Sequence, residues 1–591
     1  MSDFLFTTRR VEPGVLRGHL ERYLAPVTER VDEYHGAWGS LAVALARHDR
    51  AVVVEDERSV SVLVGDPVVR VAPDAAGRAA TGDRRATVHR LLRSGEAVAW
   101  DERLDGQFAA LTVDTAAGGG RVLTDLFAFV PVFAAEPEDG RSAGLVLGTH
   151  VDAVAWAAGR NRDVDPVSAA DLVVNLTVTF PHTVFRGVEQ VWPGTERSFA
   201  AGRGWTGPGR TYWQPLERNP YGSLDEAAEA LRDGFAEDVR AACHEERTAG
   251  LLLSGGEDSR AVLGAVPAGV EVRAFVFGDR ENREVRVARA VARAHGAELV
   301  PGWRHPDHYA RGFAEVAALV GSSQLFMDVH GYGFHDALGV RDLPVVLGGL
   351  SSDSLLKADK HGESTSGSGA RADRIRAELP PTPPVREELA AAVAERRAAF
   401  RHRLAELRPG SAAEWERVWP FSMRKHAANV HGNRRLFAAH EAYHCSAVVK
   451  VAAAAPVRWK KDRALFRRAM RPFFARTWHV PHARWRFPYF GRAANLALLP
   501  GLAAVRGVRA LATGELRARQ GPWPKWSHVA NSRAADELRR AHPLLASPLA
   551  AIFAPGAGED EVARAVREGW HPLRRLVVLQ AAYLLRKAAG E

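Results

Sequence analysis

Cysteine and long apolar segments are the scarcest features of this 591-residue chain. Its two cysteines, Cys243 and Cys445, form no Cys-x-x-Cys motif, which excludes a disulfide framework and a cysteine-ligated zinc site and fits a reducing compartment. No apolar run reaches the roughly 18 residues of a membrane-spanning helix, and residues 1–10 lack the apolar core of a signal peptide. We therefore expect a cytoplasmic protein with no membrane partner.

A concentrated basic block is also absent. Lys and Arg number 79 against 70 Asp and Glu, which gives a net charge of +9, but the arginines are spread along the chain among the acids. Nucleic-acid-binding chains usually gather their basic residues in one tract or on one face. We therefore expect no nucleic-acid partner. The length exceeds what one hydrophobic core supports, so the chain should have several domains.

Residues 1–210 are predicted to form a β-rich domain. Short runs of β-branched and apolar residues recur there, separated by glycines and polar turns, as is typical of a mainly antiparallel sheet structure. The runs are 40–45, 50–56, 59–65, 108–114, 121–125 and 144–150.

Residues 211–591 are predicted to form a second domain in which strands alternate with helices. An amphipathic helix at 224–245 precedes strands at 250–253, 272–278, 298–302 and 344–349, the last of which is expected to close the series. This alternation favours a doubly wound parallel sheet. Helical spacing dominates from about 385 onward, and a helical C-terminal extension begins at about 480.

Two further expectations concern the helical part of the second domain. A Pro/Ser/Gly-rich segment at 362–384 is predicted to be a loop over the site. His440 and His444 are spaced four residues apart in a stretch that we expect to be helical, but without a third ligand this spacing does not favour zinc.

The strongest chemical signal is LLLSGGEDSRAV at 251–262, an apolar strand that leads through two glycines into a helix. Glycines let the backbone turn tightly and present N–H groups to a ligand, and the helix N-terminus adds a partial positive charge. An acid in such a cradle repels phosphate unless Mg²⁺ lies between them. No Gly-Lys-Ser/Thr follows, so this is not a P-loop. The predicted pyrophosphate-binding residues are Ser254, Gly255, Gly256, Asp258 and Ser259.

A second segment, VVLGGLSSDSLL at 345–356, repeats the order of strand, glycines, hydroxyl residues and acid. If its strand lies beside the first, the carboxylates of Asp258 and Asp353 converge on one Mg²⁺–pyrophosphate. Taken alone, the segment is equally compatible with an ordinary turn.

These motifs resemble those of a known superfamily. SGGEDS is similar to the SGGxDS pyrophosphate motif of the ATP-pyrophosphatases, and GGLSSDS stands where asparagine synthetases carry their second motif, usually SGEGSDE. In the first 200 residues, LDGQFA, TDLFAFVPVF, LGTH and TVFRGVEQVWPG match landmarks of that family's glutaminase-like domain. The resemblance implies an Ntn-type β-rich sandwich, then an α/β ATP-pyrophosphatase domain, with ATP and Mg²⁺ as cofactors.

The resemblance also assigns further site residues. Leu252 and Phe277 match strand residues that flank the adenine, although core packing explains them as well. Gly348 and Gly349 match the backbone that meets the nucleotide. Lys461 and Arg463 fall near the register of a family lysine that stabilises the acyl-transfer transition state, although a solvated basic helix face explains them equally well.

The departures from the family pattern are informative. Position 2 is Ser2, whereas a working glutaminase of this family has cysteine there. Leu350 replaces the family's Glu or Tyr and cannot transfer a proton, and Ser354 replaces an acid. We therefore expect no glutaminase activity, and an amine that comes from the substrate itself.

This pattern most resembles the lasso-peptide macrolactam synthetases, relatives of β-lactam synthetase. The implied reaction adenylates an Asp or Glu side chain of a precursor peptide, after which the peptide's N-terminal amine displaces AMP. The implied partners are that peptide, with a leader peptidase and a leader-binding protein of the same pathway. Two alternatives stay open: an amide ligase for a small metabolite, and a non-catalytic nucleotide-binding regulator.

Overall fold

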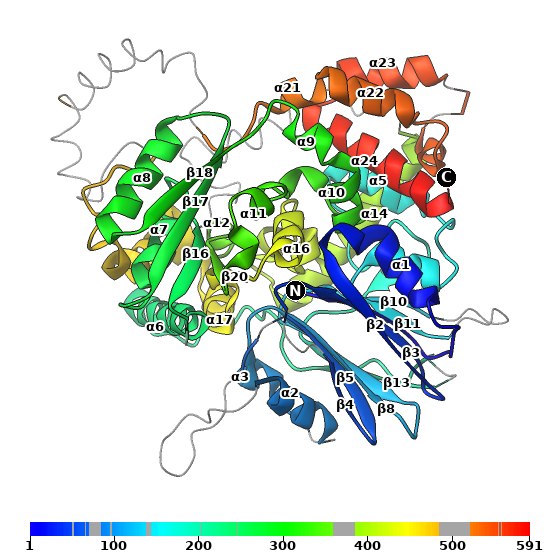
Figure 1. The fold of residues 1–591 in the computed structure, drawn as a ribbon, viewed down its shortest axis with the longest axis horizontal. Helices are drawn as coiled ribbons and strands as arrows, with labels where there is room; N and C mark the ends of the chain where they lie inside the picture. Colours follow the sequence, from blue (N-terminus) through cyan, green and yellow to red (C-terminus); the bar gives the residue numbers. More distant parts are fainter. Residues whose placement is uncertain are drawn as a thin grey trace.

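The computed structural model in Figure 1 is described here for most of the chain. The predicted loop at 362–384 lies outside the described residues, as does the stretch RWRFPYFGR at 484–492, near the start of the C-terminal extension. The described residues are 1–49, 53–65, 67–69, 84–94, 97–136, 144–201, 204–244, 246–357, 385–483, 501, 521–553, 555–556 and 558–590.

The N-terminal part is a sandwich of two antiparallel sheets, as predicted. One sheet has the order β12 (Val188–Gln190), β10 (Phe133–Ala135), β11 (Val146–Gly148), β1 (Asp3–Thr7), β3 (Gly39–Ala46) and β2 (Thr28–Gly36). The other has the order β14 (Gly204–Trp205), β13 (Thr195–Ala200), β9 (Gly120–Thr124), β8 (Phe108–Asp114), β5 (Ser59–Gly65) and β4 (Val53–Asp56), and β15 (Arg210–Thr211) pairs with β13.

The alternation of side chains along β1 explains how the sandwich packs. Successive residues of a strand point to opposite faces. Phe4 and Phe6 enter the core between the two sheets, whereas Leu5 packs on the other side, in the cluster that contains Leu16 and Leu20 of α1 (Val15–Leu24). One face of this sheet therefore contacts the second sheet and the other is covered by helices.

The second domain contains a five-stranded, fully parallel sheet, which confirms the predicted α/β fold (Figure 1). Its order is β18 (Glu298–Trp303), β17 (Glu271–Gly278), β16 (Thr248–Leu252), β19 (Val346–Gly348) and β20 (Ala439–Glu441). The expectation that the strand near 344–349 closes the series is wrong. β20 is a three-residue edge strand in an otherwise helical stretch, too short to leave a periodic signal.

The predicted long helix is α6 (Leu224–Ala242). Ser223 caps it by accepting the N–H of Glu226, and Leu231, Phe235 and Val239 are fully buried on the face that the spacing predicts. α6 contacts α17 (Ser446–Ala454) and α19 (Ala464–Met470). This packing covers one side of the parallel sheet with the helical part of the same domain.

The chain beyond 385 is mostly helical, as predicted, but the expected helix across the histidine cluster is wrong. α16 (Ala427–Leu436) ends before His440, which lies in β20, and His444 lies in a short 3₁₀ turn, η5 (Ala442–His444). The two imidazoles have different partners: His440 Nε2 lies 2.7 Å from Asp238, and His444 Nε2 lies 2.7 Å from Ser351 Oγ.

The C-terminal extension forms a helical layer at the upper right of Figure 1, drawn in orange and red. It consists of α21 (Trp526–Ala530), α22 (Arg533–Ala541), α23 (Glu559–Gly569) and α24 (Pro572–Ala589). α24 packs against α5 (Pro166–Asn175) of the N-terminal part and against α10 (Phe313–Val320) of the second domain. The extension therefore joins the two parts.

A buried ion cluster also fixes the sandwich to the second domain. Asp3 of β1 accepts hydrogen bonds from Arg434 Nη2 and Arg435 Nη2 of α16, both at 2.7 Å. All three side chains are buried. Because an unpaired buried charge is strongly destabilising, the two domains are held in one arrangement at this point.

Within the described residues, no helix has both the length and the apolar character needed to span a membrane.

Candidate functional site

The two predicted motifs meet at the carboxyl edge of the parallel sheet. β16 and β19 are neighbours, with Leu251 in register with Leu347, so the loops that follow them leave the sheet side by side. A Cβ placed on Gly349 would lie 3.0 Å from the backbone nitrogen of Ser259 and 3.2 Å from the backbone carbon of Asp258. Glycine at 349 thus lets the second loop approach the start of α7 (Asp258–Ala265).

The first loop satisfies much of its own backbone. Ser254 N–H donates to Ser259 Oγ (2.9 Å), Gly255 N–H donates to Glu284 Oε1 (2.7 Å), and Gly256 N–H donates to Ser254 Oγ (3.1 Å). The expectation that the glycine N–H groups are available to a ligand is therefore wrong for Gly255 and Gly256 in this structure, because a buried loop pairs its donors locally. The donors that remain for an anion lie in the first turn of α7, where no side chain caps the helix.

Asp258 lies next to a lysine that the sequence did not single out. Lys357 Nζ contacts Asp258 Oδ1, lies 3.0 Å from Glu257 Oε1, and sits 4.0 Å above the ring of Phe466. The Lys357 side chain is 3% exposed and that of Asp258 is 30% exposed. Lys357 follows the second motif directly, and its ammonium brings positive charge onto the acids of the first motif.

Glu257, the variable residue within SGGEDS, is the centre of this ion cluster. Its Oε1 also accepts a hydrogen bond from Arg463 Nη1 at 2.6 Å. Burial opposes the ionisation of Glu257, but Lys357 and Arg463 outweigh it and lower the pKa of the carboxyl to about 2. The first motif therefore has a fixed carboxylate with two cations beside it, where a polyphosphate would bring further negative charge.

Asp353, the second predicted metal ligand, lies near the start of α12 (Ser352–Leu355). Its Oδ1 accepts hydrogen bonds from Arg424 Nη2 (3.0 Å) and from Ser354 Oγ (3.1 Å). Like Asp258, it contacts a cation in the absence of ligand. Ser354, which stands where the family has an acid, serves here as a hydrogen-bond donor.

Asp258 and Asp353 are the acids that would hold a magnesium ion brought in with phosphate, and each of them contacts a cation in this structure, Lys357 and Arg424 respectively. Mg²⁺ is commonly bound by one or two carboxylates, with substrate phosphates supplying further oxygens. In the part of the chain that the structure describes, no group of three or more His, Cys, Asp or Glu side chains is arranged to hold a metal. Two carboxylates alone would leave most of the coordination of Mg²⁺ to the nucleotide and to water.

The residues expected to flank the adenine lie at the same edge. Leu252 ends β16, and Phe277 precedes the last residue of β17. The ring of Phe277 stacks on Phe334 with centroids 4.6 Å apart and an interplanar angle of 7°. Both predicted residues are partly exposed, so they retain surface for contact with a base.

The two predicted catalytic cations differ in their surroundings. Arg463 is buried, has a left-handed backbone with φ of 62°, and pairs with Glu257. Lys461 is exposed on the 3₁₀ turn η6 (Lys461–Arg463), and its neighbour Lys460 is buried against Glu414 at 2.9 Å. The structure therefore brings Arg463, but not Lys461, into the described ion cluster of the first motif.

Glu441, at the end of β20, is a further buried acid that the sequence did not indicate. Its carboxylate packs against Gly348 and accepts the N–H of Leu350 at 3.0 Å. Burial raises the pKa of Glu441 to about 7. Its place follows from strand pairing across about 90 residues, which no local pattern reveals.

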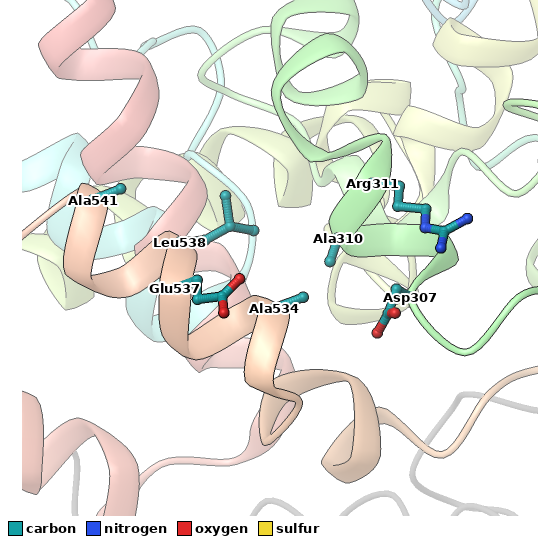
Figure 2. Close-up of a pocket in the computed structure, with 7 residues that line it drawn as sticks. All are labelled: Asp307, Ala310, Arg311, Ala534, Glu537, Leu538 and Ala541. Carbon is teal, nitrogen blue, oxygen red and sulfur yellow. The ribbon is translucent and has the colours of Figure 1, made fainter.

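Two surface cavities lie away from this edge. Figure 2 shows one of about 450 Å³ between α9 (His308–Arg311) and α22, with Ala310 on one side and Glu537 and Leu538 on the other. A second, of about 460 Å³, lies at the start of α5 and includes Asp165 and Arg396. No lining residue of either cavity belongs to the two motifs.

Comparison with known proteins identifies the family. A family model described as asparagine synthase matches residues 230–588, which is more than half of the chain and includes both motifs. No curated protein matches. One similar solved structure is glutamine phosphoribosylpyrophosphate amidotransferase from B. subtilis complexed with ADP and GMP, with 10% identity, a TM-score of 0.23, and coverage of 53% of this chain and 70% of that one. Nothing about activity follows from a similarity this low. By the family match, the chain belongs to the asparagine synthase family of ATP-dependent amide ligases.

Proposed function

We propose that this protein is a macrolactam synthetase that closes an amide bond within a ribosomally made peptide. The observation that carries the ATP-dependent half of the proposal is the contact of the two motif loops at one sheet edge, with Asp258 and Glu257 beside Lys357 and Arg463. That edge has anion-binding donors, acids for a metal, and cations for a polyphosphate. The peptide half rests on the sequence resemblance and on the departures at Ser2 and Leu350.

In the first step, a peptide carboxylate attacks the α-phosphorus of ATP, and the bond to pyrophosphate breaks. The first turn of α7 and the hydroxyls of Ser254 and Ser259 bind the leaving pyrophosphate. Asp258 and Asp353 would hold Mg²⁺, which when bound neutralises charge on the phosphates. The products of this step are an acyl-adenylate and pyrophosphate.

Lys357 is the residue that we add to this step. Its ammonium is buried, is fixed by Glu257, and adjoins Asp258 at the place where phosphate would enter. We assign it to contact the phosphates once nucleotide is bound, with Glu257 as its anchor. A preorganised cation of this kind stabilises charge that develops on the leaving group.

In the second step, the peptide's amine attacks the acyl carbon and AMP leaves. Holding both reacting groups on one substrate makes this step unimolecular, which favours ring closure. Leu350 offers no proton-transfer group. Arg463 is permanently charged and can stabilise an oxyanion, but it cannot act as a base. Lys461 is a weaker candidate than Arg463 for stabilising the oxyanion, because its side chain is exposed.

The N-terminal sandwich is proposed to lack glutaminase activity. Ser2 Oγ donates a hydrogen bond to Asp49 at 2.7 Å and accepts the N–H of Ala46 at 3.1 Å, and the side chain is buried. Burial, and not these hydrogen bonds, is what keeps the hydroxyl from an external glutamine amide. The amine that closes the ring would then be the N-terminal amine of the peptide itself. A leader peptidase and a leader-binding protein of the same pathway would supply that peptide.

The substrate class can be tested by measuring pyrophosphate release from ATP with matched substrates. We expect release with a peptide that carries a free N-terminal amine and an internal Asp or Glu, together with loss of one water from the peptide mass. The control is the same peptide with that Asp or Glu changed to Asn or Gln, which should give no release.

Two other results of this experiment would each support one of the alternative functions. Turnover of single amino acids with ammonia would support the small-metabolite ligase and overturn the peptide assignment. Binding of ATP without turnover of any carboxylate would support a nucleotide-binding regulator.

A further inference from the structure

A single histidine connects the N-terminal sandwich to the second motif. The two ring nitrogens of His444 have different partners: Nε2 lies 2.7 Å from Ser351 Oγ, and Nδ1 lies 2.7 Å from Gln107 Nε2. Gln107 lies between β7 (Leu104–Asp105) and β8 of the sandwich. One imidazole therefore spans the boundary between the sandwich and the loop that carries Asp353.

The surroundings of the ring fix its orientation. Phe129 of the sandwich stacks on His444, with ring centroids 3.8 Å apart and an interplanar angle of 7°, and Phe421 meets it edge-on at 5.2 Å. Gln107, Ser351 and His444 are 6%, 3% and 2% exposed. Burial lowers the pKa of His444 well below its usual range, so the ring is neutral.

A neutral imidazole has one donor and one acceptor, so the hydrogen bonds from Gln107 through His444 to Ser351 have a direction. With the amide nitrogen of Gln107 facing Nδ1, as in this structure, Nδ1 is the acceptor and the ring proton is on Nε2. His444 then donates to Ser351 Oγ, and Ser351 keeps its own O–H to donate elsewhere. The sandwich side chain thus sets the role of a hydroxyl in the second motif.

Ser351 needs such support because of its backbone. It has φ of 75° and ψ of −11°, in the left-handed region, directly before α12. A non-glycine residue there is strained and persists only where its surroundings fix it. The preceding residue is held as well, because the N–H of Leu350 donates to Glu441.

We propose that Gln107, His444 and Ser351 form a positioning relay through which the N-terminal sandwich holds the second motif in its ATP-binding conformation. The inference rests on the proposed function, because it gives the sandwich a part in adenylation that needs no glutamine hydrolysis. None of the three residues is assigned to contact the reacting atoms. They act by holding Gly349 and Asp353 in position.

A double-mutant cycle tests the relay through carboxylate-dependent exchange of pyrophosphate into ATP. Gln107→Met and Ser351→Ala should each lower kcat about tenfold, and the double variant should be no slower than the slower single one, because both break one chain. His444→Phe, which keeps the stacking on Phe129, should show the same loss. Gln190→Met, a change at a buried glutamine of β12 in the same sandwich, is the matched control and should leave kcat unchanged.

A second variant separates positioning from simple stability. Ser351→Gly relieves the left-handed strain but removes the hydroxyl, so its Tm should be equal to or above that of the wild type while kcat falls about tenfold. A purely structural role would lower Tm in the Gln107 and His444 variants and leave kcat of the folded enzyme unchanged. Losses of kcat that multiply in the double variant would also overturn the relay.

The cycle stays informative if the proposed function fails. If the wild type exchanges no pyrophosphate with any carboxylate, the adenylation assignment falls, and the relay is tested by calorimetric binding of ATP with Mg²⁺. The relay then predicts weaker ATP binding in each single variant and no further loss in the double variant. Unchanged ATP affinity in all of them would overturn it.

Discussion

Asp258→Asn should reduce the rate of adenylation by at least about 10³-fold, which corresponds to ~4 kcal/mol of transition-state stabilisation. The change removes a charge that is assigned to the metal at the start of α7, next to Lys357 and Glu257. The side chain is partly exposed at a strand end and is not a core residue. The thermal midpoint of unfolding should therefore change little, and pyrophosphate release from ATP measures the loss.

The matched control for this substitution is Asp233→Asn. Asp233 lies on the exposed side of α6 and pairs with Arg232 there, so the variant should keep wild-type turnover. Asp353→Asn should reproduce most of the loss seen in Asp258→Asn. Full turnover in Asp258→Asn would mean that the metal is held by other residues, and the assignment of both aspartates would fall.

Lys357→Met should lower both the stability of the fold and kcat. The ammonium lies against Glu257, so its removal leaves a buried carboxylate with one cation fewer, which costs about 3–5 kcal/mol. Loss of a phosphate-contacting cation should lower kcat by about 10²–10³-fold. Unfolding midpoints and pyrophosphate release measure the two effects separately.

A second substitution shows which effect belongs to catalysis. In Lys357→Met with Glu257→Gln, the carboxylate that lost one of its two cations is removed as well, so part of the stability should return while kcat stays low. If kcat returns as well, Lys357 only neutralises Glu257, and its contact with phosphate is wrong. Lys450→Met removes a lysine that pairs with Asp101 elsewhere and serves as the control.

The sequence predicted those parts of the site that depend on local pattern. The order of apolar strand, glycines and helix is visible in the local sequence. The loop from Ser254 to Ser259 and the strand that ends at Gly348 could therefore be located. The neighbouring positions of β16 and β19 were only a condition of the predicted site, and the structure meets that condition. The antiparallel sheets of the N-terminal part were predicted from short apolar runs separated by glycines and turns, and the sandwich from the family resemblance.

The rest of the site depends on contacts between residues far apart in the chain. Lys357 reaches Asp258 across 99 residues, and Arg463 reaches Glu257 across 206. Glu257 occupies a variable position of the motif, where an acid carries no signal of its own. β20 was missed because three residues leave no periodicity, and its absence hid both Glu441 and the turn that carries His444.

The bare N–H groups expected at Gly255 and Gly256 illustrate a different limit. Sequence patterns describe what a loop is able to bind, whereas a ligand-free loop pairs its donors with the nearest acceptors, here Glu284 and Ser254. The sequence also did not determine which residues of the second domain the C-terminal extension contacts. In the structure, the ring of Trp523 is tilted by 43° against that of His330, with ring centroids 4.1 Å apart, and Trp523 stays 44% exposed.

The proposed function depends on which phosphate bond of ATP is cleaved. The most direct measurement is the product balance from ATP labelled at the α- and γ-phosphates, followed during turnover with a carboxylate substrate. Cleavage between the α- and β-phosphates predicts AMP and pyrophosphate in equal amounts, and neither product from the Asp258→Asn variant. Formation of ADP and inorganic phosphate would contradict a pyrophosphate cradle at Ser254–Ser259 and the function proposed from it.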